Sequence, residues 1–202
     1  MELIPNHPKA DLHVIVGTTN IKSIRYYKEY LWFKKEDTDL SQLNTQFTLI
    51  PMTEEHGKLI CGWKYPAPYD IYNWPSWEQM KRHEEEFADP RIRSSQYHAV
   101  IDASGELCGF AQLFPMLGVT RLGLGMKPDR CGRRQGAGTA FVKAIVQEAR
   151  RLKSDDEIDL EVLTWNERAI RTYAKAGFEP TDSYEKMTPK GMSAFYCMVY
   201  RD

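Results

Sequence analysis

The sequence has few cysteines and no long apolar run, and each shortage excludes a class of protein. The four cysteines among 202 residues are scattered without a Cys-x-x-Cys pair. We therefore expect no disulfide framework and no metal site. No stretch approaches the ~20 apolar residues of a membrane span, and the N-terminus lacks the basic and apolar blocks of a signal peptide. These absences predict a cytoplasmic protein without a membrane partner.

An excess of charge of one sign is also missing. Lysine and arginine number 27 against 28 aspartates and glutamates, so the basic surplus of a general nucleic-acid binder is absent. Hydrophobic residues make up 42% and charged residues 27%, which is ordinary usage for a globular protein. We expect no nucleic-acid partner and a chain organised as residues 47–202, one domain, preceded by residues 1–46 as an extension.

Hydrophobic periodicity and turn residues predict alternating strands and helices in the larger part. The expected strands are residues 47–51, 96–101, 106–114, 119–126, 158–163 and 195–200. The expected helices are a stretch opened by Thr53 as N-cap, a helix-like stretch at residues 76–88 ending at Asp89-Pro90, residues 138–153, and residues 166–176 closed by Gly177. An antiparallel meander that leads into a β-α-β unit implies an α/β or α+β sandwich.

The loop at residues 126–138, between a strand and a helix, combines glycine with positive charge. Gly136 and Gly138 allow backbone amides to approach a ligand closely, and the following helix offers unpaired N–H groups. The loop carries Lys127, Arg130, Arg133 and Arg134 against Asp129 alone. A pyrophosphate suits this loop. The alternative is a glycine-rich turn with solvated arginines.

Two blocks of the sequence resemble the GNAT superfamily of N-acetyltransferases. The first, Arg133-x-x-Gly136-x-Gly138, is similar to that family's acetyl-CoA signature. The second spans residues 160–178 and contains Asn166, Ala169-Ile170, Tyr173 and Gly177-Phe178 in the family's order. The loop before Gly136 is longer than is usual in the family, and another register would place Arg134 at the first glycine position. The resemblance covers roughly residues 47–202.

This resemblance implies a mixed, mostly antiparallel central sheet with helices on both faces. It also implies an acetyl-CoA-dependent N-acetyltransferase, a transferase acting on a primary amine of a small molecule or peptide, as a monomer or homodimer. The residues it assigns to the cofactor are Leu124, Met126, Arg133, Arg134, Gly136, Ala137, Gly138, Thr139 and Asn166. The rival interpretation is a non-catalytic acyl-CoA-binding or interaction module on the same fold.

Tyr173 falls on the position that protonates the leaving thiolate in many family members. A phenol with a pKa of ~10 is able to donate that proton. Tyr173 could instead be a core aromatic, and Asn166 could merely cap its helix.

The general base is not evident in the sequence. The family often places a glutamate on the strand before the cofactor loop, but residues 120–126 contain no carboxylate. Asp70, His98 and Glu161 are the possible substitutes.

Residues 63–77, the aromatic segment, contain three tryptophans and three tyrosines among prolines. In the family this region contacts the substrate, so we expect Asp70 and Trp74 to bind a cationic amine by ion pairing and cation–π contact. The alternative is that these aromatic rings pack a lid into the core.

Residues 13–28 can be aligned on residues 159–174 at one constant offset. Asn20 then falls on Asn166 and Tyr27 on Tyr173. The N-terminal 46 residues therefore resemble a partial repeat of the second block without its own cofactor loop, or else two amphipathic strand–helix units agree by chance.

Overall fold

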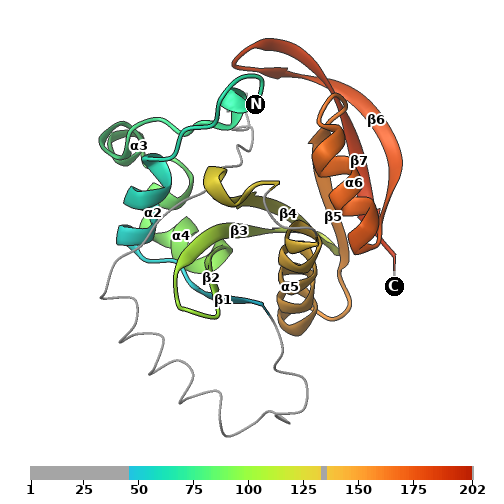
Figure 1. Ribbon diagram of the computed structural model, residues 1–202, viewed down its shortest axis with the longest axis horizontal. Helices are drawn as coiled ribbons and strands as arrows, with labels where there is room; N and C mark the ends of the chain where they lie inside the picture. Colours follow the sequence, from blue (N-terminus) through green and yellow to red (C-terminus); the bar gives the residue numbers. More distant parts are fainter. Residues whose placement is uncertain (1–45, 133–135, 202) are drawn as a thin grey trace, which may run out of the picture.

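The computed structural model describes residues 46–132 and 136–201. A seven-stranded sheet forms the centre of this part of the protein (Figure 1). The strands are β1 (Phe47–Pro51), β2 (Tyr97–Asp102), β3 (Leu107–Met116), β4 (Val119–Met126), β5 (Glu157–Leu163), β6 (Phe178–Thr188) and β7 (Gly191–Tyr200). Their order is β1-β2-β3-β4-β5-β7-β6. The strand–helix unit expected within residues 1–46 lies outside the described residues.

Within the described residues, β4 and β5 form the one parallel pair of the sheet. A parallel pair requires a crossover connection, and α5 (Ala137–Leu152) provides it. The sheet is therefore mixed and mostly antiparallel, and the predicted fold class is confirmed.

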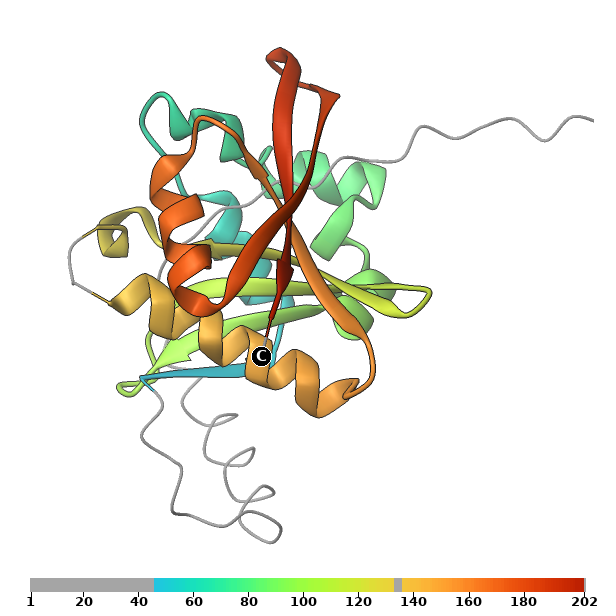
Figure 2. The ribbon, with the colours of Figure 1, turned by 90° about the vertical axis from the view of Figure 1, so that its right-hand side faces the viewer.

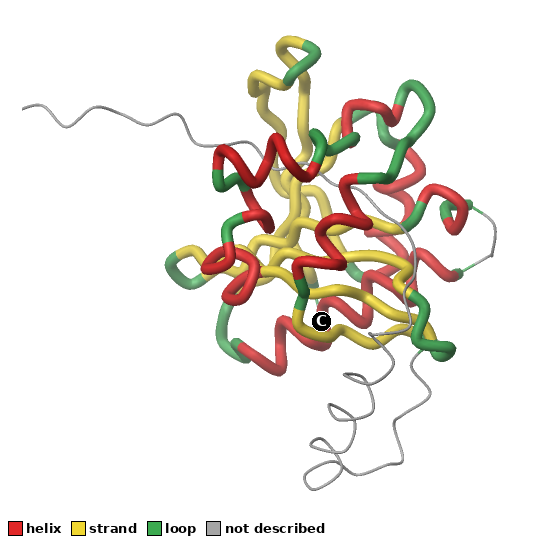
Figure 3. The backbone as a smooth tube through the Cα atoms, turned by 90° about the vertical axis from the view of Figure 1, so that its left-hand side faces the viewer, coloured by secondary structure: helices red, strands yellow, loops and turns green. Residues whose placement is uncertain are grey.

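Both faces of the sheet are buried by helices. The α5 and α6 (Glu167–Ala176) helices pack on the face that Val100 and Ala111 present. The opposite face, presented by Ala99 and Phe110, is covered by α2 (Glu54–Cys61), α3 (Trp77–His83), α4 (Pro90–Gln96) and the aromatic segment. Figure 3, seen from that side, shows the short helices and their loops in front of the sheet.

Helix ends follow the capping residues in the sequence. The Thr53 hydroxyl accepts a hydrogen bond from the His56 N–H at 3.2 Å, and the His56 Nδ1 accepts one from the Thr53 N–H at 3.2 Å. Gly177 ends α6 in the left-handed conformation with φ of 110°, which glycine adopts without steric cost. The predicted caps at Thr53 and Gly177 are confirmed.

The helix-like stretch expected at residues 76–88 is divided in the structure. The α3 helix ends at His83 because Glu84 turns left-handed, and a short 3₁₀ turn, η4 (Glu86–Ala88), follows. Asp89-Pro90, interpreted as a stop, instead begins α4: the Asp89 side chain accepts from the Arg91 N–H at 2.6 Å, and Pro90 occupies the first turn.

The β6 strand was not predicted. Its residues are mostly polar and exposed, since it is the edge strand of the sheet and has one neighbour, β7. The two strands form a long hairpin whose tip projects beyond the rest of the domain (Figure 2). The hairpin matters for the candidate site because its residues Lys186 and Phe195 line the cavity described below.

Candidate active site

The two parallel strands pair over only part of their length. Their register runs from Val119↔Glu157 to Leu122↔Leu160, and β4 then continues to Met126 and β5 to Leu163 without pairing to each other. A cavity of about 500 Å³ opens between these ends and is lined by Leu124, Met126, Val162 and Leu163. Unpaired strand edges leave backbone N–H and C=O groups that need a partner, so an extended, amide-containing ligand fits this opening.

One end of the cavity reaches the start of α5. Gly136, Gly138 and Thr139 line it there, and Gly136 precedes the helix with a φ of 82°. A Cβ added at Gly136 would meet no atom of the described residues within 4 Å. The first N–H groups of a sixteen-residue helix point toward this end and carry the positive end of its dipole, which suits an anion.

The end of β4 is tied down by side chains from elsewhere. The Met126 carbonyl accepts a hydrogen bond from the Tyr65 hydroxyl at 2.8 Å and another from the Cys131 thiol at 3.1 Å. That carbonyl is therefore already satisfied within the protein. Tyr65 connects the aromatic segment to the strand that walls the cavity.

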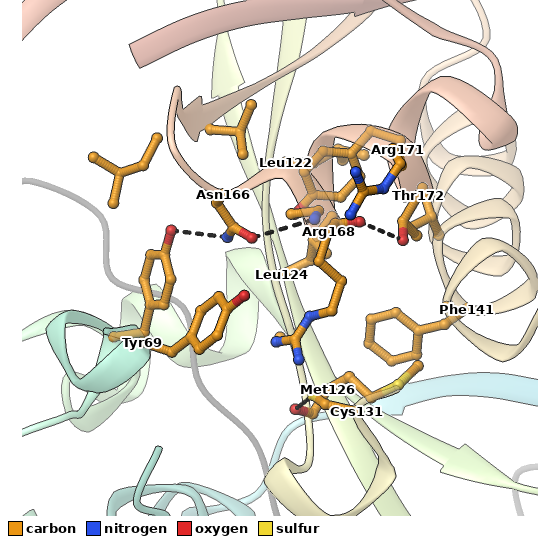
Figure 4. A pocket seen from close by; sticks show the side chains of 18 of the residues that line it. Tyr69, Leu122, Leu124, Met126, Cys131, Phe141, Asn166, Arg168, Arg171 and Thr172 are labelled. Atoms are coloured by element: carbon orange, nitrogen blue, oxygen red, sulfur yellow. Dashed lines mark hydrogen bonds between the residues drawn. The ribbon is translucent and has the colours of Figure 1, made fainter. Parts of the chain in front are cut away.

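Asn166 has two structural tasks at the opposite wall. Its Oδ1 caps α6 by accepting the Ala169 N–H at 3.2 Å, and its Nδ2 donates to the Tyr72 hydroxyl at 3.1 Å (Figure 4). The residue is buried and lines the cavity. The capping interpretation is confirmed, and the second bond fixes Tyr72 of the aromatic segment beside the site.

Tyr173 lies about two helical turns further along α6. It is 9% exposed, lines the cavity, and packs its ring edge-on against Phe178 at 6.2 Å. Burial raises the pKa of its hydroxyl well above the usual value, while the Arg168 guanidinium acts in the opposite direction. The hydroxyl is protonated at neutral pH, as an unperturbed phenol also is, and burial makes it a weaker acid.

Of the three candidate bases, Glu161 lines the cavity, whereas Asp70 and His98 do not. Burial alone would raise the pKa of Glu161, but hydrogen bonds from Lys186 and Tyr184 and the charge of Arg121 hold that pKa below its usual range. One oxygen of Glu161 lies 2.6 Å from the Arg121 guanidinium. Glu161 is therefore an ionised carboxylate at the cavity wall.

The site lies inside a recognised sequence family. The family described as "Acetyltransferase (GNAT) family" matches residues 65–178, more than half of the chain, including both strands that wall the cavity. The chain belongs to the GNAT family of acetyltransferases. No curated protein sequence matches it.

Solved structures share the fold of this GNAT domain at low sequence identity. A chimera of the spermidine N-acetyltransferase SpeG from Vibrio cholerae with hSSAT is 16% identical, with a TM-score of 0.63 over 77% of this chain and 95% of that one. AAC(6')-Ib in complex with ribostamycin and coenzyme A is 21% identical, with a TM-score of 0.57 over 77% of this chain and 93% of that one. Both likenesses confirm the GNAT fold.

The GNAT cavity brings together most of the residues expected at the cofactor site. Lining residues are Leu124, Met126, Gly136, Gly138, Thr139, Asn166 and Tyr173. Ala137 is buried in the first turn of α5 and lines a neighbouring hollow instead. Arg133 and Arg134 lie outside the described residues.

The two residues expected on the substrate side lie elsewhere. The Asp70 carboxylate pairs with Lys190 of the β6–β7 hairpin at 2.6 Å. Trp74 is 4% exposed and packs against Phe87 in the core beneath the aromatic segment, at a centroid distance of 4.9 Å. Neither residue lines the cavity.

Several cavity residues were not found from the sequence. The aromatic segment contributes Tyr65, Tyr69 and Tyr72 rather than its tryptophans. Arg168, two residues after Asn166, extends from α6 toward Tyr69 (Figure 4). Arg168 is five residues before Tyr173, a spacing that does not place the two on one face of a helix, so the predicted position of Tyr173 gave no signal for Arg168.

The described residues contain no group of three or more histidine, cysteine, aspartate or glutamate residues placed to hold a metal ion. Among their helices, none combines the length and the apolar character that a membrane crossing requires.

Proposed function

We propose that the protein is an acetyl-CoA-dependent N-acetyltransferase that transfers acetyl directly to a primary amine, with Tyr173 as general acid. One observation carries this proposal. The buried Tyr173 lines a cavity that runs from the unpaired edges of β4 and β5 to the start of α5. Structures of a GNAT neighbour with coenzyme A and with acetyl-CoA support the choice of cofactor.

The residues present fit this cofactor. The start of α5, with Gly136, Gly138 and Thr139, would hold the pyrophosphate, joined by Ala137, Arg133 and Arg134. Leu124, Met126 and Asn166 would border the pantetheine arm. Acetyl-CoA supplies an activated acetyl thioester, and the chain needs no nucleophile of its own for a direct transfer.

The chain's own proton carriers lie on two walls of the cavity. Tyr173 on α6 would donate its hydroxyl proton to the leaving group and recover a proton from solvent. Glu161 on β5, held ionised by its cationic neighbours, would accept the proton that the amine loses. Asp70 and Trp74 would affect the acceptor through the position of the aromatic segment, since Asp70 ties it to the hairpin and Trp74 supports it from the core.

A non-catalytic acyl-CoA-binding module is the alternative. It is favoured by one observation: both oxygens of Glu161 are already engaged, by Arg121 and Tyr184 on one and Lys186 on the other. Release of free thiol from acetyl-CoA in the presence of a broad panel of primary amines separates the two. We expect amine-dependent release. Tight CoA binding without release on any amine would establish the module instead.

The Gly136→Asp substitution tests the cofactor end of the cavity. It places a negative charge where the pyrophosphate would bind, so we expect the affinity for CoA to fall at least about tenfold, equivalent to ~1.4 kcal/mol. Titration calorimetry with CoA measures this.

Gly136→Asn is the matched control. Asparagine has the shape of aspartate and also tolerates the left-handed backbone at this position, where φ is 82°. It should lose much less affinity than the aspartate. Equal affinities for both variants and the unmodified protein, with folding intact, would remove the start of α5 from the cofactor site.

A further inference from the structure

The charged side chains that line the main cavity are mostly cationic. Within the described residues the lining cations are Arg121, Arg130, Arg168, Arg171, Lys175 and Lys186, and the lining anion is Glu161. Glu161 is itself engaged by Arg121 and Lys186. The described part of the cavity therefore offers no unengaged carboxylate to a positively charged ligand.

These cations divide between two ends of the cavity. Thr172, beside Arg171, lies against the start of α5, where a Cβ added at Gly138 would approach it to 3.1 Å. Arg171 and Lys175 are therefore near the end proposed for the phosphates. Arg168 lies a helical turn earlier and extends to the other end, beside the aromatic segment (Figure 4).

Arg168 differs from Arg121 and Lys186, two other cations that line the cavity. Arg121 is paired with Asp159 at 2.5 Å and with Glu161, and Lys186 is paired with Glu161. Arg168 has no carboxylate partner in the part of the chain that the structure describes. Its guanidinium instead lies over the Tyr69 ring, 4.4 Å from the centroid.

Among the described residues the Arg168 guanidinium, which lies over the Tyr69 ring, has no hydrogen-bond acceptor, so its donors are available. Stacking on an aromatic ring uses the planar face of the guanidinium, whereas its five N–H donors lie in the plane of the group and match a carboxylate in a forked geometry. Tyr69 is held in turn by Trp165, at a centroid distance of 5.6 Å. The Tyr69 and Trp165 rings thus orient the guanidinium without accepting its N–H hydrogen bonds.

We infer that Arg168 binds a carboxylate of the acceptor, so that the substrate is an amine that also carries a carboxylate, such as an amino acid. This inference rests on the proposed acetyltransferase function. Arg168 already lies over one face of the Tyr69 ring, so that face does not accept a cationic amine by cation–π contact. A polyamine would bring several positive charges into a cavity whose lining carboxylate, Glu161 among the described residues, is already shared by two cations.

Matched acceptors test the inference. A series of α- and ω-amino acids is compared with the corresponding primary amides, which keep the amine and remove the negative charge. In the preferred pair we expect kcat/KM to be at least about tenfold higher for the acid than for its amide. The reason is that the carboxylate forms a charge-assisted bidentate contact with Arg168, which the amide cannot form. Arg168→Gln should abolish this preference, mainly through KM of the acid, and Arg168→Lys should retain part of it.

Two further measurements make the result specific. Lys175→Gln removes a cation from the same helix at the other end of the cavity and should leave the acid-to-amide ratio unchanged, whatever its effect on the KM of the cofactor. Calorimetry of an N-acetylated amino acid and its amide, titrated into protein saturated with CoA, should show tighter binding of the acid, and that difference should disappear in Arg168→Gln. Thermal unfolding establishes that each variant is folded.

The outcomes separate the inference from the function on which it rests. If no amine of either series is acetylated, the proposed function fails. If acids and amides react equally well, the enzyme stands and the carboxylate inference is wrong. If Arg168→Gln lowers kcat alike for both members of each pair, Arg168 acts on the reacting thioester and not on the acceptor, which also overturns the inference.

Discussion

Replacing Tyr173 by phenylalanine should lower kcat roughly 10²-fold while leaving the affinity for CoA almost unchanged. The substitution keeps the ring that packs against Phe178 and removes only the hydroxyl. That hydroxyl is protonated over the neutral range, so the variant lacks the proton that the proposed mechanism gives to the leaving group. Steady-state kinetics with a reactive amine and calorimetry with CoA measure the two quantities.

Tyr72→Phe is the matched control for this result. Tyr72 also lines the cavity, and its hydroxyl accepts a hydrogen bond from Asn166 at 3.1 Å. Its loss should cost one neutral hydrogen bond and a small change in kcat, since the proposed mechanism assigns no proton transfer to it. Turnover of the Tyr173→Phe variant at the unmodified rate would show that Tyr173 is a core aromatic that merely borders the cavity.

The elements with a clear period and clear ends were predictable from the sequence. The β4 strand matches its predicted range of 119–126, and α5 and α6 begin or end within one residue of expectation. The alternation in β4, the apolar face of α5 and the cap at Gly177 each depend on residues close together in the chain. These signals can therefore be recognised in a single sequence. Leu152 is the exception on the apolar face of α5: it is 48% exposed because the helix ends there.

The missed elements have local signals that admit two interpretations. Asp89-Pro90 is compatible with the end of one helix or the beginning of another, since aspartate caps a helix and proline fits its first turn. The β6 strand is an edge strand whose polar residues give no buried face to detect. Its existence depends on pairing with β7, which is a tertiary contact.

The same limit applies to the candidate site. The residues of the two family blocks lie on elements that the sequence predicts, and the structure brings most of them to one cavity. The contacts that shape the other wall join distant segments: Tyr65 reaches Met126, Tyr72 reaches Asn166, and Arg168 covers Tyr69. Composition identified the aromatic segment, but only packing separates the tyrosines that line the cavity from the tryptophans that lie in the core.

Trp74→Ala should destabilise the domain by about 3–5 kcal/mol, the range for removing a large buried aromatic side chain. Trp74 is 4% exposed, and its ring contacts Phe87 at 4.9 Å and Phe110 at 6.2 Å between centroids. The small side chain would leave a cavity that these rings fill only in part. Urea unfolding of the variant and of the unmodified protein measures the free energy of unfolding.

Trp165→Ala removes the same type of side chain from an exposed position, so comparing the two variants shows how much of the lost stability is due to burial. Trp165 is 42% exposed and contacts Tyr69 of the aromatic segment, so its loss should cost no more than about 1 kcal/mol. Similar losses for the two variants would contradict the core position of Trp74.

The Trp74 variant also tests how the aromatic segment serves the acceptor. At a temperature where Trp74→Ala remains folded, the loosened segment should misplace Tyr69 and with it the guanidinium that Tyr69 supports. The KM of the amine should then rise while the affinity for CoA stays the same, because the start of α5 packs on the opposite face of the sheet. A rise in both would mean that the two faces of the sheet do not act independently. An unchanged KM of the amine would mean that the core beneath the segment does not control the position of its tyrosines.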